Sequence, residues 1–391
     1  MVRRIQERDV QGQTVLVRVD FNVPMHDGEI ADDARIRASM PTITHLLDRG
    51  AKVVLATHLG RPDGKVVPSL RLDAVGRRLG DLIGCNVHKL DRCVGPVVEQ
   101  AIAEGAPGDV ILLENLRFRP EEEANDPDFA KQLAEPIDLY VNDAFATVHR
   151  AHASTLGVAK LRPAFAGFLM QREVEALSRL TGNPKRPYLA VIGGKKASSK
   201  LGALEDLVEK VDGVLIGGGV AFSFLHALGI DVAESIVDLE MIEGIRAITE
   251  KAKAAGVKIL LPVDVIAAKE LAADAEARLF PADGIPGGWA GFDIGPATVA
   301  AFAEVIQGAG TIVWTGPMGA FEFQAFAEGT AGIADAVASS GAYSVIGGGE
   351  TGEAVARLGR ENGVSYISTG GGACLAFLRG KTLPALEALR C

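Results

Sequence analysis

Residues 14–22 read TVLVRVDFN, a short apolar run that ends in charged and polar side chains. Three more runs in the first half of the chain have the same form: AKVVLATHLGR (51–61), DVILLENLRF (109–118) and DLYVNDAFATVHR (138–150). Five runs in the second half end in glycine-containing turns instead: YLAVIGG (188–194), GVLIGGG (213–219), TIVWTGP (311–317), AYSVIGGG (342–349) and SYISTGGG (365–372). Apolar runs of strand length between longer helical patterns predict repeated βα units and parallel sheets.

The two kinds of strand ending predict two different sites. In open parallel sheets, ligands bind outside the carboxyl ends of the strands. Arginine and histidine at those ends suit an anion, because a guanidinium group offers a planar fork of donors. Glycine at those ends lets backbone N–H groups and helix N-termini approach phosphate oxygens. One glycine run by itself indicates no more than a tight βα turn, but five in one half favour a nucleotide phosphate site.

Length and composition indicate an α/β protein of two domains. The chain has 391 residues, and roughly 100 to 200 residues per domain is usual. Hydrophobic residues make up 48% of the chain and aromatic residues 5%, which is typical of an aliphatic interior around buried parallel strands. The formal net charge of -10 argues against nucleic acid or a membrane surface as partner, because both attract clustered Lys and Arg.

The cysteines, the N-terminus and the longest uncharged run predict a cytoplasmic protein. Cys85, Cys93, Cys374 and Cys391 form no Cys-x-x-Cys pair, which favours a reducing compartment and no structural zinc site. The first ten residues lack the apolar segment of a signal peptide. The uncharged run 213–230 contains three consecutive glycines, and we interpret it as a buried strand, a loop and a helix rather than a membrane span.

Two nucleotide-binding patterns are present only in part. Residues 347–352 read G-x-G-x-x-G, but the next strand ends in Ser368 and Thr369, without the acidic residue of a dinucleotide fingerprint. Residues 380–382 read GKT, but a Walker motif needs glycine where Leu375 stands. The H-R-D and D-F-G signatures of protein kinases are absent as well. A phosphoryl transferase with this sequence must therefore have another fold.

Nine motifs, in family order and spread over nearly the whole chain, resemble phosphoglycerate kinase. They are RVDFNVP (18–24), THLGRP (57–62), LLENLRF (112–118), VNDAFATVHRAHAS (141–154), GGKKASSK (193–200), GGGVAF (217–222), VWTGPMGAFE (313–322), GGGET (347–351) and STGGGA (368–373). The resemblance implies an α/β fold of two Rossmann-like parallel-sheet domains that face a central cleft and are joined by an interdomain helix.

The resemblance also implies a division of the chain. Residues 1–170 are expected to bind 3-phosphoglycerate, 171–184 to form the interdomain helix, and 185–375 to bind the nucleotide. The stretch TGNPKRP (181–187) agrees with this, since it breaks a helical pattern. Residues 376–391 are expected to pack back at the domain junction.

Site residues in the first half follow from the resemblance, position by position. Asp20 and Asn22 are expected to hold the glycerate hydroxyl and carboxylate region. Arg35 is expected near the transferring phosphoryl group, although spacing alone does not distinguish it from Arg37. The remote 3-phosphate is assigned to four basic side chains: His58, Arg61, Arg117 and Arg150.

Site residues in the second half are implied in the same way. Lys196 resembles the lysine that contacts the transferring phosphoryl group and Lys200 the one that holds the inner phosphates. Both would share one face of a helix that starts after Gly194.

Glu322 is expected to bind the ribose. The adenine slot is assigned to Gly217, Gly218, Gly219, Gly291 and residues 315–317, and the phosphates and metal to Gly348, Gly349, Glu350, Thr351, Gly370, Gly371 and Gly372. Four residues are expected to be catalytic: Arg35, Lys196, Gly349 and Gly372.

Three positions depart from the usual family pattern, namely Lys195, Thr315 and Glu350. Glu350 stands where the family usually has Asp, and its extra methylene changes the reach of the carboxylate toward Mg²⁺, which demands near-ideal geometry. We predict that the metal is still bound, mainly through nucleotide phosphates and water. Lys195 adds charge beside the phosphates or points to solvent, and the sequence leaves both open.

The implied activity is reversible, Mg²⁺-dependent transfer of a phosphoryl group between ATP and the carboxylate of 3-phospho-D-glycerate, giving ADP and 1,3-bisphosphoglycerate. Catalysis of this kind rests on positioning and charge stabilisation. The separation of the two kinds of strand ending suggests hinge closure, and the family implies a monomer. Two alternatives remain open at this point: a nucleotide sensor that lost turnover through Glu350 and Lys195, and, more weakly, a nicotinamide-dependent dehydrogenase.

Overall fold

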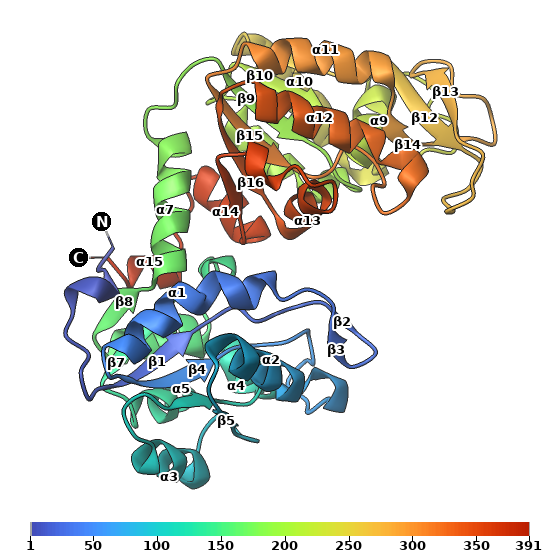
Figure 1. Ribbon diagram of the computed structural model, residues 1–391. Helices are drawn as coiled ribbons and strands as arrows, with labels where there is room; N and C mark the ends of the chain where they lie inside the picture. The colour runs from blue at the N-terminus through green and yellow to red at the C-terminus, as the bar shows by residue number, and fades with distance from the viewer. Residues whose placement is uncertain (1, 391) are drawn as a thin grey trace. The chain divides into compact units, whose positions relative to one another are not determined.

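The computed structural model describes residues 2–390, which form two compact units. The first unit runs as far as Glu175 and takes in the chain again from Thr382. The second unit is Ala176–Lys381. Each unit is built around a six-stranded sheet in which every pair of neighbours is parallel (Figure 1). The predicted fold class, α/β with two parallel-sheet domains, is confirmed.

The sheet of the first unit has the order β5-β6-β4-β1-β7-β8. Each of the four polar-ended runs of the sequence supplies one strand of this sheet, and its polar residues lie at the end of the strand or in the loop that follows. From β1 the chain passes to β4 and the edge strand β5, returns to β6, and then crosses to β7 and β8 on the other side of β1, so the strand order reverses between β1 and β7. The strands are β1 (Thr14–Arg18), β4 (Lys52–Ala56), β5 (Val87–Lys89), β6 (Val110–Leu112), β7 (Leu139–Asn142) and β8 (Ala164–Ala166).

Helices cover both faces of this sheet, with α1 on one side and α3 and α5 on the other (Figure 1). Proline at the first position and the Asp126 carboxylate, which accepts a hydrogen bond from the Phe129 N–H at 2.8 Å, start α5. The helices are α1 (Ala34–Asp48), α2 (Asp73–Ile83), α3 (Pro96–Glu104), α4 (Pro120–Glu123), α5 (Pro127–Ala134) and α6 (Val158–Leu161), with short turns η1 (Ile5–Glu7), η2 (Pro68–Leu70), η3 (Leu116–Phe118), η4 (Phe145–Thr147) and η5 (Ala153–Gly157).

The sheet of the second unit has the order β11-β10-β9-β15-β16-β17, and all five glycine-ended runs supply strands to it. The strands are β9 (Tyr188–Ile192), β10 (Gly213–Ile216), β11 (Lys258–Leu260), β15 (Thr311–Thr315), β16 (Tyr343–Gly347) and β17 (Tyr366–Ser368). The helices are α8 (Leu201–Leu207), α9 (Gly218–Ala227), α10 (Ile242–Ala254), α11 (Pro296–Gln307), α12 (Glu328–Ser339), α13 (Gly349–Arg357) and α14 (Gly371–Leu378), with turns η6 (Ala197–Ser199), η7 (Leu239–Met241), η8 (Gln324–Phe326) and η9 (Glu361–Gly363).

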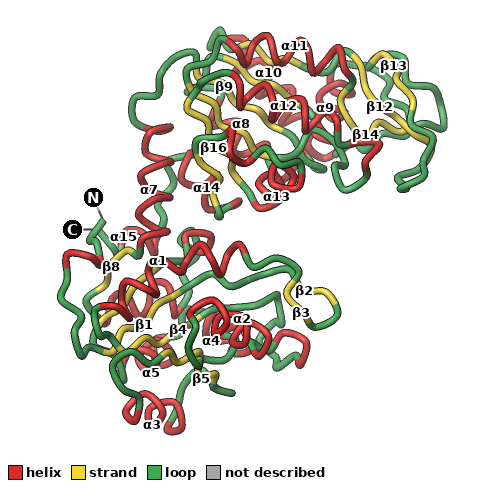
Figure 2. The backbone as a smooth tube through the Cα atoms, in the orientation of Figure 1, coloured by secondary structure: helices red, strands yellow, loops and turns green. Residues whose placement is uncertain are grey.

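Two smaller antiparallel sheets were not predicted. The second unit contains the sheet β13-β12-β14, made of β12 (Asp264–Ala268), β13 (Arg278–Pro281) and β14 (Ala290–Ile294). It has its own apolar cluster, in which the rings of Phe280 and Trp289 meet edge to face at 5.2 Å. The first unit contains the hairpin β2 (Met25–His26) and β3 (Glu29–Ile30), seen in Figure 2 as a separate pair of strands.

The helix α7 (Phe168–Thr181) begins and ends slightly earlier than the predicted 171–184. Its start is set by a residue outside its own sequence, because the buried Asp143 carboxylate accepts hydrogen bonds from the N–H groups of Leu169 (2.9 Å) and Met170 (3.2 Å). The helix contributes residues to both units, with the division after Glu175.

The C-terminal segment joins the first unit from Thr382, and residues 376–381 stay with the second unit. Its helix α15 (Pro384–Glu387) lies beside the loop after β7, where the N–H of Ala385 donates to the Val148 carbonyl at 3.3 Å. The N–H of Arg3 donates to the Leu389 carbonyl at 2.8 Å. The segment therefore returns to the N-terminal part of the chain, and its packing at a domain junction stays a prediction.

The uncharged run 213–230 forms the buried strand β10, a short turn and α9, as predicted. No helix within residues 2–390 is both long enough and apolar enough to span a bilayer.

Candidate active site

The seven residues assigned to the substrate in the first half line one cavity of 250 Å³. They come from loops after β1, β4, β6 and β7 and from the first turn of α1, so elements far apart in sequence meet at the carboxyl edge of the sheet. Glycine, alanine and threonine complete the wall. The lining consists of Asp20, Asn22, Arg35, His58, Gly60, Arg61, Arg117, Ala146, Thr147 and Arg150.

Arg35 and Arg37 have different partners, although their spacing in the sequence did not distinguish them. The Arg35 guanidinium forms an ion pair with the Asp20 carboxylate inside the cavity. The Arg37 Nε atom instead donates to the Asp33 carboxylate at 2.8 Å, away from the cavity. Residues two apart on a helix point in different directions, so the helix beginning at Ala34 selects Arg35 for the site.

His58 is a buried, neutral donor. Its Nδ1 atom lies 3.2 Å from Nη2 of Arg18, and a guanidinium group can only donate, so Nδ1 accepts and the ring proton resides on Nε2. Burial, followed by the charge of Arg18, holds the pKa of His58 well below its ordinary value. The side chain therefore offers an N–H group to an anion without adding charge.

Arg18 is a residue that the sequence reasoning missed. It is only 1% exposed, and its Nε atom donates to Ser154 Oγ at 2.8 Å. Ser154 in turn donates its hydroxyl to the buried Glu122 carboxylate at 2.5 Å. Burial raises the pKa of Glu122. The available signal was an arginine at the end of a wholly apolar strand, since a buried cation requires partners.

Asn115 was also missed, and it joins the two loops that carry His58, Arg61 and Arg117. Its Oδ1 atom accepts from the N–H groups of Leu59 (3.2 Å) and Arg117 (3.1 Å). Its Nδ2 atom donates to the carbonyls of Leu59 (2.8 Å) and Leu70 (2.9 Å). Because the side chain is fully buried and uses both ends, it positions the basic side chains without touching the cavity.

The glycine-ended strands of the second unit pack backbone against backbone. A Cβ atom on Gly193 would lie 2.2 Å from the Pro317 carbonyl oxygen, and one on Gly217 would lie 2.5 Å from the Met318 sulfur. Gly218 has φ +61°, and a Cβ there would lie 2.8 Å from the Gly194 nitrogen. Only glycine fits such approaches. The ends of β9, β10 and β15 therefore form a surface of bare peptide groups.

Two helix N-termini lie beside this surface. Helix α13 begins at Gly349 and α14 at Gly371, and a Cβ on Gly371 would be 3.4 Å from the Gly348 Cα. The first N–H groups of a helix have no partner within the helix and favour anions. Gly372 is exposed in the first turn of α14, and its role at the phosphates stays a prediction.

Lys196 and Lys200 do not share a helix face. Lys196 is exposed and precedes the short turn η6, whereas α8 begins only at Leu201. The expected helix after Gly194 is wrong, because Gly194 has φ +97° and Lys196 is extended. Lys200 is partly buried, its Nζ atom donates to Thr315 Oγ1 at 3.1 Å, and burial lowers its pKa.

Glu350 and Thr351, neighbours in the first turn of α13, differ in exposure. Thr351 is buried, and its hydroxyl accepts a hydrogen bond from the Gly316 N–H at 2.6 Å, which ties α13 to the end of β15. Glu350 is exposed. Within residues 2–390 there is no cluster of three or more His, Cys, Asp or Glu suited to a metal. A single carboxylate fits Mg²⁺ that is held mainly by phosphates and water.

The surroundings of Gly291 and Glu322 do not by themselves indicate a nucleotide-binding role. Gly291 is buried, and a Cβ there would lie 2.1 Å from the Phe222 ring, so packing alone explains the glycine. Its N–H donates to Ser235 Oγ at 2.9 Å. Glu322 is exposed in the loop between β15 and η8. Their adenine and ribose roles stay predictions.

Comparison with known proteins decides the family. A sequence model described as "Phosphoglycerate kinase" matches residues 5–381. The chain belongs to the phosphoglycerate kinase family. It is 50% identical to phosphoglycerate kinase from Moorella thermoacetica over 98% of both chains, and 50% identical to the cytosolic phosphoglycerate kinase of Triticum aestivum over 99% of this chain and 98% of that one.

Solved structures of phosphoglycerate kinases have the same fold as this chain. The structure from Coxiella burnetii has a TM-score of 0.87 at 42% identity and covers 100% of this chain and 99% of that one. The structure from Pyrococcus horikoshii has a TM-score of 0.90 at 35% identity, with 99% and 98% covered. The resemblance to phosphoglycerate kinase is thus confirmed, and a sensor or a nicotinamide-dependent dehydrogenase is not favoured.

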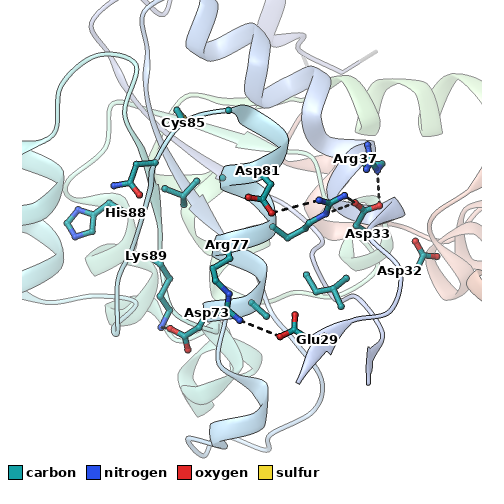
Figure 3. A pocket seen from close by; sticks show the side chains of 18 of the residues that line it. Glu29, Asp32, Asp33, Arg37, Asp73, Arg77, Asp81, Cys85, His88 and Lys89 are labelled. Carbon is teal, nitrogen blue, oxygen red and sulfur yellow. Dashed lines mark hydrogen bonds and ion pairs between the residues drawn. The ribbon is translucent and has the colours of Figure 1, made fainter. Parts of the chain in front are cut away.

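A larger groove of 1440 Å³ lies elsewhere in the first unit, between α2, β5 and the β2–β3 hairpin (Figure 3). Its basic side chains are paired with carboxylates of the same lining: Arg78 pairs with Asp33 at 2.7 Å, Arg77 with Glu29 at 3.9 Å, and Lys89 with Asp73 at 3.2 Å. The smaller cavity has an excess of arginine and is the better anion site for a phosphoglycerate kinase.

Proposed function

We propose that the protein is a phosphoglycerate kinase that uses these residues to move a phosphoryl group, reversibly, between ATP and the carboxylate of 3-phospho-D-glycerate, a step of glycolysis and gluconeogenesis. The observation that carries the assignment of residues is the convergence of four arginines, His58, Asp20 and Asn22 on one 250 Å³ cavity. We also propose that the enzyme works in the cytoplasm as a monomer.

On the substrate side, Arg61, Arg117 and Arg150 take the 3-phosphate, because guanidinium groups bind phosphate oxygens through paired N–H donors. His58 adds a neutral N–H donor. Asp20 and Asn22 take the glycerate hydroxyl and carboxylate region. The Asn22 Oδ1 atom already accepts from the Gly60 N–H at 2.8 Å, which leaves its amide N–H groups for the substrate.

On the nucleotide side, the N-termini of α13 and α14 receive the phosphates, with Gly348, Gly349 and Gly372 as backbone donors. Lys200 binds the inner phosphates and Lys196 the transferring group. Glu322 binds the ribose, and Gly217, Gly218 and Gly291 line the adenine slot. Glu350 would hold Mg²⁺ through water, and the bound ion would neutralise charge on the phosphates.

The transfer requires no general base in the protein, because the attacking carboxylate is already ionised at neutral pH. The obstacle is repulsion between anions, which fixed donors such as Arg35 and the helix N–H groups reduce. The reacting atoms must come within about 3 to 3.5 Å, and we therefore include in the proposal a hinge closure that brings the two sites together.

The test is a single assay of the purified protein with ATP, Mg²⁺ and 3-phosphoglycerate, read as ADP release. ADP that depends on 3-phosphoglycerate supports the proposal. Tight binding of ATP with no ADP release would contradict it and would favour the alternative, a nucleotide sensor without turnover. A preparation without Mg²⁺ should release ADP far more slowly.

A further inference from the structure

Glu123 lies against Arg117 and Arg150, two of the arginines that line the anion cavity. Its Oε1 atom is 3.2 Å from Arg117 Nε and 3.9 Å from Arg150 Nη1. Arg117 and Arg150 line the cavity, whereas Glu123 stands just behind them at the end of α4. One carboxylate oxygen therefore reaches both guanidinium groups that the proposed function assigns to the 3-phosphate.

The short helix α4 holds Glu123 there through its neighbours. Glu122 is fully buried and accepts hydrogen bonds from Ser154 N (2.9 Å) and Ser154 Oγ (2.5 Å). Glu121 turns outward and pairs with Arg119 at 2.8 Å. Consecutive glutamates thus have three different partners, and Glu123, which is 46% exposed at its side chain, can move without disturbing the interior, unlike Glu122.

Three of the four cavity arginines already have a carboxylate partner. Arg35 is paired with Asp20. The Nη1 atom of Arg117 donates to the Gly60 carbonyl at 2.9 Å, and its Nε atom forms an ion pair with the Glu123 carboxylate at 3.2 Å. Within residues 2–390, no ion pair involves Arg61. A phosphate that bridges Arg117 and Arg150 must therefore compete with the Glu123 carboxylate for the same guanidinium groups.

We infer that Glu123 is an internal competitor of the substrate phosphate: its carboxylate pairs with the guanidinium groups of Arg117 and Arg150 and is displaced from them when phosphate binds. This inference rests on the proposed function, in which those arginines hold the 3-phosphate. Competition lowers the affinity of every anion that needs these donors by the same factor. Weakly held anions are thereby kept out of the cavity, while 3-phosphoglycerate is retained through its other contacts.

The test is Glu123→Gln, with Glu121→Gln as the matched control on the same helix. Dissociation constants for 3-phosphoglycerate and for inorganic phosphate are measured by calorimetry in low-salt buffer. A partly exposed ion pair is worth a factor of roughly two to five, so Glu123→Gln should bind both ligands about two- to fivefold more tightly, by similar factors. Glu121→Gln should match the unaltered protein.

Unchanged or weaker binding by Glu123→Gln would overturn the inference, because the carboxylate would then only hold the arginines in place. A gain for 3-phosphoglycerate without a gain for inorganic phosphate would also overturn it. Glu123→Ala, which removes the carboxylate and any replacement donor, must show the same direction. Failure of the unaltered protein to bind 3-phosphoglycerate would instead contradict the proposed function, so the two failures are distinguishable.

Discussion

The Nη2 atom of Arg18 lies 3.2 Å from Nδ1 of His58. Arg18 ends β1, whereas His58 follows β4, and these two strands are neighbours in the sheet. A buried strand residue thus decides which ring nitrogen of a cavity residue carries the proton. The relationship makes Arg18 a positioning residue for the anion site, held in turn by Ser154 and Glu122.

His58 is expected to remain neutral, with its proton on Nε2, at pH 6.5, where an ordinary histidine is half protonated. The reason is that burial and Arg18 hold its pKa well below the ordinary value. Nitrogen-15 NMR of the ring, assigned with His58→Gln, would check this. Signals of a doubly protonated ring at pH 6.5 would contradict it.

In Arg18→Gln, the preference of the His58 ring for the Nε2–H form should weaken and the KM for 3-phosphoglycerate should rise.

Arg35→Ala is expected to lower kcat by about 100-fold or more, since removing one donor to a developing charge has an effect of that order. ATP affinity should stay nearly unchanged. Arg37→Ala is the matched control, because Arg37 lies on the same helix turn but pairs with Asp33 outside the cavity. Steady-state kinetics and ATP binding would measure both. Equal losses in the two variants, or a collapse of ATP binding in Arg35→Ala, would refute the assigned role.

Gly218→Ala is expected to weaken nucleotide binding and to destabilise the fold more than Gly229→Ala. Both glycines have positive φ, which costs an alanine about 1 to 2 kcal/mol, but only Gly218 also lacks space, with Gly194 N 2.8 Å from the added carbon. Nothing lies within 4 Å at Gly229. Urea denaturation and ADP binding would compare them. Similar stability and ADP affinity in both variants would argue against a requirement for glycine at the close backbone approach of Gly218 to Gly194.

Stability is expected to fall as the pH drops from about 6.5 toward 4, in part because of His152. Burial, and then the charges of Arg18, Arg117 and Arg150, lower its pKa to about 4. Below pH 6.5 the unfolded chain therefore binds a proton that the folded chain does not, so protonation favours unfolding. Between pH 7.5 and 5.0 this group accounts for up to about 2 kcal/mol.

His152→Gln should reduce that loss of stability, measured as the free energy of unfolding in urea at the two pH values. His88→Gln is the control, because His88 is exposed on β5. An identical pH dependence in His152→Gln and in the unaltered protein would show that the imidazole of His152 is not the group responsible.

The anion-binding character of the site could be predicted because strand endings are local features, and the resemblance to phosphoglycerate kinase supplied the role of each residue. Asp20, Asn22, His58 and Arg61 each follow an apolar run within a few residues, and parallel strands bring such endings to one edge. The lysines show the limit of this reasoning. Their helix was expected from spacing, but the backbone at Gly194 delays α8 until Leu201.

The sequence by itself determined the alternation of strands and helices, the two kinds of strand ending and the family, since these depend on residue types at short spacing. Only the tertiary structure decided that Arg18 and Asn115 position the side chains of the cavity and that Glu123 stands behind Arg117. The physical reason is that these are hydrogen bonds and ion pairs formed by side-chain direction and by folding, most of them between distant parts of the chain, and no short sequence pattern encodes which partners will meet.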